Sequence, residues 1–94
     1  MMTNKRFASV WDAISPTPQE AENMKLRSAL MMALDRYIQS RGWTQAEAAV
    51  RLGVTQPRIS DLMRGKIGRF SIDRLVKMVS AAGLHIHVQI DEAA

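Results

Sequence analysis

The sequence predicts a mostly α-helical domain of four to five helices that ends in one β-strand. Apolar residues recur at helical spacing through the middle of the chain, residues 44–62 carry the caps and turn of two closely joined helices, and residues 84–91 alternate between apolar and polar side chains. A length of 94 residues suits one small domain. We therefore expect an amino-terminal segment at 1–23, a helical domain at 24–83 and a strand at 84–91.

The amino-terminal segment contains a short amphipathic pattern, which two prolines separate from the following helix. Its apolar residues are spaced i, i+3, i+4 and i+7, so they would share one face of a helical turn. These residues are Phe7, Val10, Trp11 and Ile14. Pro16 and Pro18 disfavour a helical conformation at the residues before them. Two interpretations remain open: the segment covers its own domain, or its apolar face docks into the groove of a partner protein.

The first long helix is expected to begin between Thr17 and Asn23 and to end near Arg41, before Gly42. Its inward residues are expected to be Met24 or Leu26, with Leu30, Met31, Leu34 and Ile38.

Two short helices with a tight turn follow. Thr44 and Glu47 form a capping box, and Gly53 supplies the left-handed conformation that ends a helix. Thr55 caps the second helix, and Pro57 falls in its first turn, where a missing N–H costs little. This is the plan of a DNA-binding helix-turn-helix, whose second helix enters the major groove. The alternative is a plain hairpin of two helices in a bundle. Trp43, just before the pair, is expected to pack on the first or the last helix.

A basic loop at residues 65–70 leads to a last helix, which Ser71 caps and Gly83 ends. Its core candidates are Leu75, Val76, Met78 and Val79. The strand after it carries its apolar residues on one face, namely Leu84, Ile86, Val88 and Ile90. A lone strand cannot satisfy its own backbone, and no second strand of similar quality is present. We therefore expect these four residues to form a dimer interface, by antiparallel pairing with a second copy of the chain.

Charge and composition narrow the function classes. The net charge is +4, yet residues 41–77 alone carry eight basic and three acidic residues, a net charge of +5, which leaves −1 for the rest of the chain. This asymmetry favours a polyanionic partner. Cysteine is absent, and no apolar run is long enough to span a membrane. We expect a cytoplasmic protein with no membrane partner.

Catalysis and metal binding are not expected. No paired carboxylates, nucleophile–base set or phosphate-cradling glycine loop is recognisable, so we expect no enzyme activity and no cofactor. His85 and His87 could share one face of the strand, but the chain offers no further histidine and no cysteine as ligands. They are better explained as polar strand residues than as a metal site.

The helix pair resembles the helix-turn-helix of the lambda/Cro-type repressor family, also called the XRE family. The residues that carry the resemblance are Thr44-Gln45, Ala49, Leu52-Gly53-Val54, Thr55-Gln56, Ile59-Ser60 and Gly65. With the run Phe70-Ser71-Ile72-Asp73-Arg74-Leu75 and the histidine-bearing strand, the chain looks most like the small HigA-type antitoxins. The resemblance implies a lambda-repressor-like fold, repression of the protein's own operon, and neutralisation of a RelE-like ribonuclease toxin.

Residues around the second helix of the motif are the candidates for contacts with double-stranded operator DNA arranged in paired half-sites. Gln56 suits a bidentate contact with adenine, and Pro57 suits apolar contact with a thymine methyl. Arg58 suits a guanine or a phosphate, whereas Asp61 would accept from cytosine, orient Arg58 or Arg64, or remain solvated. The remaining candidates, for phosphate or minor-groove contacts, are Gln45, Thr55, Ser60, Arg64, Lys66 and Arg69.

The sequence thus predicts a repressor that acts as an antitoxin, with DNA, a second copy of itself and a toxin as partners. In this interpretation Phe7, Val10, Trp11 and Ile14 contact the toxin. The alternatives are a stand-alone transcriptional regulator of the same family and an interaction module whose basic face binds RNA or an acidic protein. The interaction-module interpretation conflicts with the helix-turn-helix pattern, in which the second helix is well placed to contact DNA.

Overall fold

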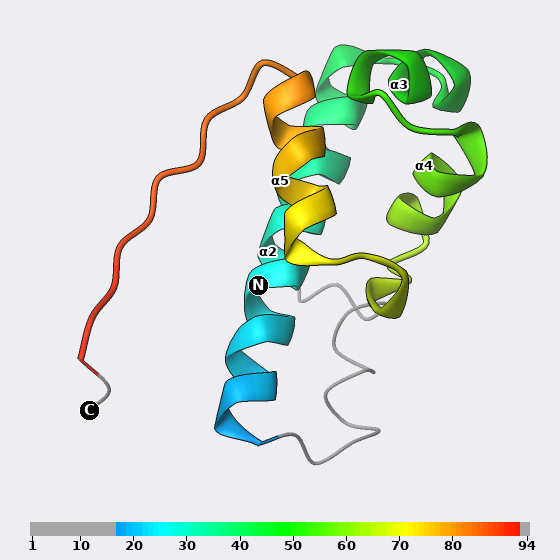
Figure 1. Cartoon of the computed structure of the whole chain (residues 1–94). Helices are drawn as coiled ribbons and strands as arrows, with labels where there is room; N and C mark the ends of the chain where they lie inside the picture. The colour runs from blue at the N-terminus through cyan, green and yellow to red at the C-terminus, as the bar shows by residue number, and fades with distance from the viewer. Residues whose placement is uncertain (1–16, 93–94) are drawn as a thin grey trace.

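A computed structural model describes residues 17–92. The elements in chain order are α2 (Pro18–Arg41), α3 (Gln45–Leu52), α4 (Gln56–Met63), the 3-10 turn η1 (Ile67–Arg69) and α5 (Ile72–Ala81). Figure 1 shows α5 lying along the long helix α2, while α3 and α4 pack together at the side of this pair. Within residues 17–92 no helix has the length and hydropathy that crossing a membrane requires. The predicted apolar face at Phe7, Val10, Trp11 and Ile14 lies outside the described residues.

Caps at both ends of α2 explain its length. The Thr17 N–H donates to Glu20 Oε1 at 3.0 Å, and the Glu20 N–H donates to Thr17 Oγ1 at 3.2 Å, which forms a capping box. At the other end Gly42 adopts φ 69°, the left-handed conformation that terminates a helix. The predicted start and end of this helix are confirmed. The helix begins before residue 24, so its first turns come from the part of the sequence assigned to the amino-terminal segment.

One core lies between α2 and the other helices. Its largest fully buried side chains come from α2, α4 and α5: Met31, Leu34, Ile38, Ile59, Leu62, Leu75 and Met78. The open choice at the start of α2 is settled, because Met24 is buried whereas Leu26 is 44% exposed. Val76 was expected in the core and is 41% exposed, so that prediction was wrong. Leu75, Met78 and Val79 already fill the inward face of α5, which leaves Val76 on its outer side.

The loop between α4 and α5 is more ordered than its sequence suggests. Ile67 and Phe70 are buried, and the η1 turn joins them. Arg27 reaches this turn from α2: its Nη1 donates to the carbonyl oxygens of Ile67 at 3.1 Å and Phe70 at 3.3 Å. The long helix therefore holds the loop through side chain–backbone hydrogen bonds that join residues some forty positions apart.

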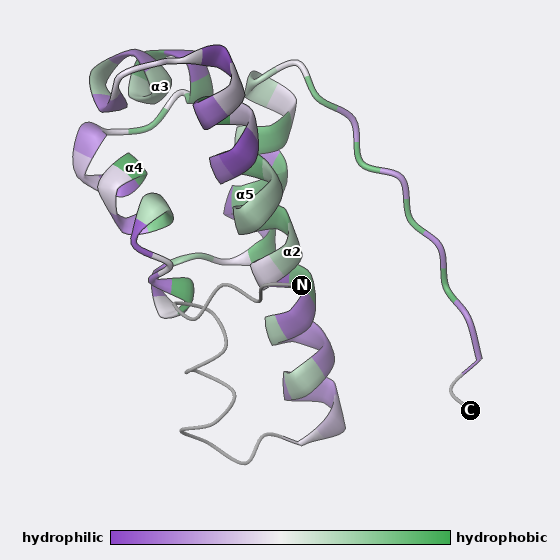
Figure 2. Ribbon diagram, turned by 180° about the vertical axis from the view of Figure 1, so that it is seen from behind, coloured by the Kyte–Doolittle hydropathy of each residue, from purple (hydrophilic) through white to green (hydrophobic). Residues whose placement is uncertain are grey.

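The chain leaves α5 as an extended tail, residues 84–92. The Leu84 N–H donates to the Val79 carbonyl, and Leu84 packs on the core. Beyond Leu84 no backbone hydrogen bond joins the tail to another described residue, and residues 17–92 contain no β-strand. Val88 is 74% and Ile90 is 89% exposed, and Figure 2 shows apolar and polar residues alternating along the tail. The strand and its pairing across a dimer therefore remain a prediction that needs a second chain.

Candidate nucleic-acid interface

The α3–turn–α4 unit is built as the sequence predicts. The Thr44 N–H donates to Glu47 Oε1 at 3.1 Å and the Glu47 N–H returns a bond to Thr44 Oγ1 at 3.1 Å. Gly53 ends α3 with φ 70°, and the Val54 N–H donates to the Ala49 carbonyl at 2.9 Å. These bonds cap both ends of an eight-residue helix that would be marginal alone. The capped helix α3 packs directly against α4.

The recognition helix α4 turns one side inward. Thr55 Oγ1 accepts the Arg58 N–H at 3.4 Å and caps the helix, and Pro57 lies in its first turn. Ile59 and Leu62 are fully buried and anchor α4 against the core. Gln56, Pro57 and Arg64 are exposed. An exposed face with polar side chains at the start of the helix matches the geometry that reads bases in the major groove.

A shallow hollow joins the starts of α3 and α4. It has a volume of about 250 Å³, and its lining residues are Gln45, Gln56, Pro57 and Ser60. All four were candidates from the sequence, and the structure brings them to one place. Two side-chain amides and a hydroxyl there can donate to phosphate oxygens or base edges. The first turn of α3 adds N–H groups that lack partners within their own helix.

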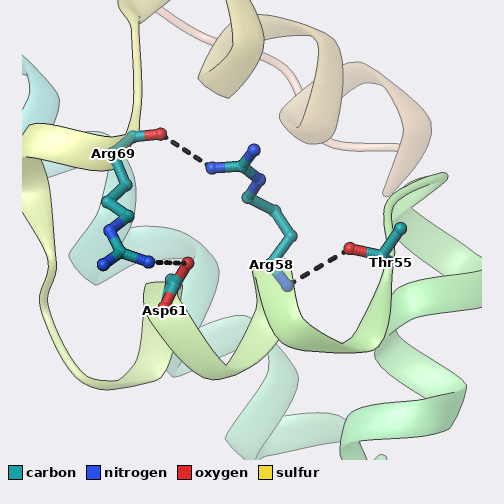
Figure 3. A network of polar contacts seen from close by, with 4 residues as sticks. All are labelled: Thr55, Arg58, Asp61 and Arg69. Carbon is teal, nitrogen blue, oxygen red and sulfur yellow. Dashed lines mark hydrogen bonds and ion pairs between the residues drawn. The ribbon is translucent and has the colours of Figure 1, made fainter.

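A cluster of charged side chains links α4 to the loop after it (Figure 3). Arg58 Nη1 donates to the carbonyl oxygen of Arg69 at 2.9 Å, and its guanidinium carbon lies 5.4 Å from the centroid of the Phe70 ring. Arg69 Nη1 in turn lies 3.3 Å from Asp61 Oδ2. The Arg69 side chain is still 59% exposed, against 16% for Asp61. The pair therefore presents one cation at the surface and holds its carboxylate half-buried.

Asp61 has a partner that none of the three roles left open by the sequence included. Its carboxylate pairs with Arg69, eight residues on. Helical spacing pointed to neighbours within α4, but the loop folds back over the helix and the Lys66 N–H donates to the Asp61 carbonyl at 3.0 Å. This backbone contact brings the arginine of the loop to the acid.

The remaining candidates lie around the same helix. Arg64 is exposed at the end of α4, and Lys66 is half-buried in the loop. Thr55 uses its oxygen as a cap acceptor, which leaves its hydroxyl proton available to a phosphate. The ten candidates thus lie on α3, α4 and the following loop, and whether they bind DNA remains a prediction.

Trp43 packs just before the start of α3. Its ring meets Tyr37 of α2 edge-on, with centroids 5.6 Å apart, and it is packed against the core. The expected contact with the first long helix is confirmed. Arg51 of α3 lies over the same ring at 5.1 Å, so one tryptophan ties the end of α2 to the body of α3.

Sequence reasoning missed two residues that shape this interface. Arg27 lies on α2, far from the motif in sequence, yet its hydrogen bonds hold the loop that carries Arg69. Phe70 is buried, and the Arg58 guanidinium packs over its ring. No periodic signal marks Arg27, but an aromatic residue in a basic loop was a readable sign of a buried anchor. Among residues 17–92 no group of three potential metal ligands comes together.

Comparison with known proteins agrees with this geometry. A family model described as a helix-turn-helix domain matches residues 15–91, which include all the described elements and nearly all of the extended tail. No match was found among curated proteins. A fold of this kind suggests a DNA-binding regulator. Because the match covers most of the sequence, the chain belongs to this family of helix-turn-helix domains.

Proposed function

We propose that the protein is a sequence-specific repressor that binds its own operator and acts as the antitoxin of a toxin–antitoxin pair. The observation that carries the DNA-binding part is the recognition helix α4, with Ile59 and Leu62 buried and Gln56 and Pro57 exposed beside Gln45 of α3. Gln56 reads a base edge, and Gln45 and Ser60 contact phosphates. Such a protein acts where its operator lies, in the cytoplasm, and the proposal includes no catalytic step.

The proposal includes a homodimer formed through Leu84, Ile86, Val88 and Ile90. Support comes from the tail, where Leu84 packs on the core but Ile86, Val88 and Ile90 are exposed apolar side chains. A groove of about 580 Å³ separates the tail from α2, with Leu26 and Ala29 on one side and Val88 and Ile90 on the other. A second tail paired antiparallel with the first would satisfy its backbone and cover these apolar groups. Two recognition helices would then read paired half-sites.

The antitoxin part rests on the resemblance to HigA-type antitoxins. Its partner is a RelE-like toxin, and its contact surface is the amino-terminal face of Phe7, Val10, Trp11 and Ile14. A separate segment would let the protein hold the toxin while α4 stays available to DNA. The second candidate is a stand-alone regulator of the same family. The match to a helix-turn-helix domain supports both candidates equally.

Two measurements test the two parts separately. Gel shifts with the promoter fragment upstream of the gene test repression, and a Gln56→Ala variant reports on α4. Co-expression with the product of the adjacent reading frame tests the antitoxin role. Formation of a stable complex that suppresses ribonuclease activity supports it. Specific operator binding without any complex or suppression would leave the stand-alone regulator as the function.

A further inference from the structure

A cleft beside the recognition helix gathers four arginines. It has a volume of about 490 Å³ and is lined by residues of α2, α4, the loop and the start of α5. The charged residues of its lining are Arg27, Arg58, Arg69 and Arg74. Among the described residues that line it, none is acidic. Four like charges around one open space repel each other, so an anion between them would be stabilised.

Arg27 is one of the two half-buried arginines of the cleft, with Arg58. Its Nη1 is held by two backbone carbonyls, and its Nε is buried without a hydrogen-bond partner among the described residues. No carboxylate of residues 17–92 lies within ion-pair distance of it. A half-buried charge that meets only carbonyl dipoles is incompletely compensated. An anion in the cleft would supply the missing charge.

Most of the positive charge of the other three arginines is not neutralised by a carboxylate of the described residues. Within the described part of the chain only Arg69 has a carboxylate partner, Asp61, at 3.3 Å. Arg58 donates a hydrogen bond to the Arg69 carbonyl and packs over the Phe70 ring. These contacts orient its guanidinium without neutralising its charge. Arg74 is exposed in the first turn of α5. The amino-terminal end of this ten-residue helix adds its own partial positive charge beside Ser71.

We propose that this cleft binds a phosphate group, and that on DNA it holds a backbone phosphate outside the contacts of Gln45, Gln56 and Ser60. This inference rests on the proposed DNA binding. Arg58 belongs both to α4 and to the cleft, so a duplex seated on α4 brings its backbone towards the other arginines. Guanidinium groups suit phosphate because they donate two parallel hydrogen bonds. The interaction strengthens binding and fixes orientation without reading sequence.

Gly68 is a suitable position for a substitution that blocks the cleft, because an added side chain causes neither a clash nor backbone strain. A Cβ added there meets no atom within 4 Å, and its φ is not in the left-handed range. Because Gly68 lines the cleft, Gly68→Glu introduces a carboxylate at its wall, and Gly68→Gln is the matched control of equal size. Arg74→Gln removes one exposed lining charge, with Lys77→Gln on the same helix as its control. Circular dichroism checks that each variant folds.

The first arm measures binding of the full chain to a short duplex of random sequence over a series of salt concentrations. The slope of log K against log salt is negative, and neutralising one phosphate fewer makes it less steep by about 0.9. We expect Gly68→Glu and Arg74→Gln to reduce the steepness of the slope by about one unit, while Gly68→Gln and Lys77→Gln stay near wild type. Equal slopes for Gly68→Glu and Gly68→Gln would overturn the assignment to a DNA phosphate.

The second arm measures binding of pyrophosphate to the same proteins by calorimetry, without DNA. Weak binding that Gly68→Glu abolishes and Gly68→Gln retains supports a phosphate site. Binding of this kind together with unchanged salt slopes would identify a free phosphorylated ligand and overturn the DNA part. Unchanged slopes with no binding would overturn the whole inference. If wild type binds no duplex at all, the proposed function fails, and the calorimetry still decides whether the cleft binds phosphate.

Discussion

The carboxylate of Asp61 lies 3.3 Å from the guanidinium of Arg69 and joins the recognition helix to the loop that follows it. The pair fixes the direction of a cation that would otherwise sample many rotamers. Because Arg69 remains more than half exposed, we treat the pair as a positioning device with a small contribution to stability.

A double-mutant cycle tests this device. Asp61→Asn, Arg69→Gln and the double variant should each change the free energy of unfolding by about 1 kcal/mol or less. In DNA binding the two changes should not be additive, since Asp61 acts through Arg69. Additive effects on operator affinity, measured by fluorescence anisotropy, would show that Asp61 contacts the DNA independently.

A substitution at Gly53, in the turn between α3 and α4, should reduce the stability of the domain. Gly53 has φ 70° with open space around it, so Gly53→Ala adds backbone strain without any clash. We expect it to lower the free energy of unfolding by about 1 kcal/mol, the strain of an alanine in the left-handed region. Gly68→Ala is the control, because its added methyl also meets open space but its φ is not left-handed. Urea unfolding of both variants gives the comparison, and equal stabilities would contradict this account of the turn.

Removal of the apolar tail should dissociate the proposed dimer into monomers. Ile86→Lys places a charge in the proposed interface, where an unpaired buried charge costs several kcal/mol. Truncation after Gly83 should act in the same way and lower operator affinity with it. Gln89→Lys, which changes a residue on the opposite face of the predicted strand, is the control. Sedimentation velocity should show a dimer for wild type and Gln89→Lys only, and an intact dimer after truncation would exclude the tail as the interface.

The amino-terminal segment carries the prediction about the toxin. Tryptophan side chains often dominate binding energy, so Trp11→Ala should weaken the toxin complex by about 2 kcal/mol or more. Its effect on the melting temperature of the isolated protein should be small, because the segment is expected to contact the partner and not the core. A large fall in melting temperature would instead assign Trp11 to the core of its own domain.

Local signals predicted most of this fold. The caps at Thr44, Thr55 and Ser71 and the left-handed glycine at Gly53 depend on residues close in sequence, and all are confirmed. Helical spacing was less decisive on α5, where Val76 lies next to the buried Leu75 but faces outward. Adjacent apolar residues on a helix cannot be ranked until the packing partner is known.

Contacts across long stretches of sequence escaped the sequence analysis. The hydrogen bonds of Arg27 with Ile67 and Phe70 depend on how α2 packs on the loop, and no pattern within either segment indicates them. The pairing of Asp61 with Arg69 was missed for the same reason, because helical spacing considers only neighbours on one helix. The proposed pairing of the tail involves a second chain, so a single chain does not test it.

The most direct test of the central claim is the binding of wild-type protein and Gln56→Ala to the promoter fragment and to fragments with single base-pair changes. If α4 reads the operator through Gln56, the variant should lose about 1–3 kcal/mol on the promoter and should no longer discriminate at one base pair. Mutation of that base pair should then weaken the wild-type protein but not the variant. Equal affinities and equal base preferences for the two proteins would contradict the assignment of α4 as the recognition helix.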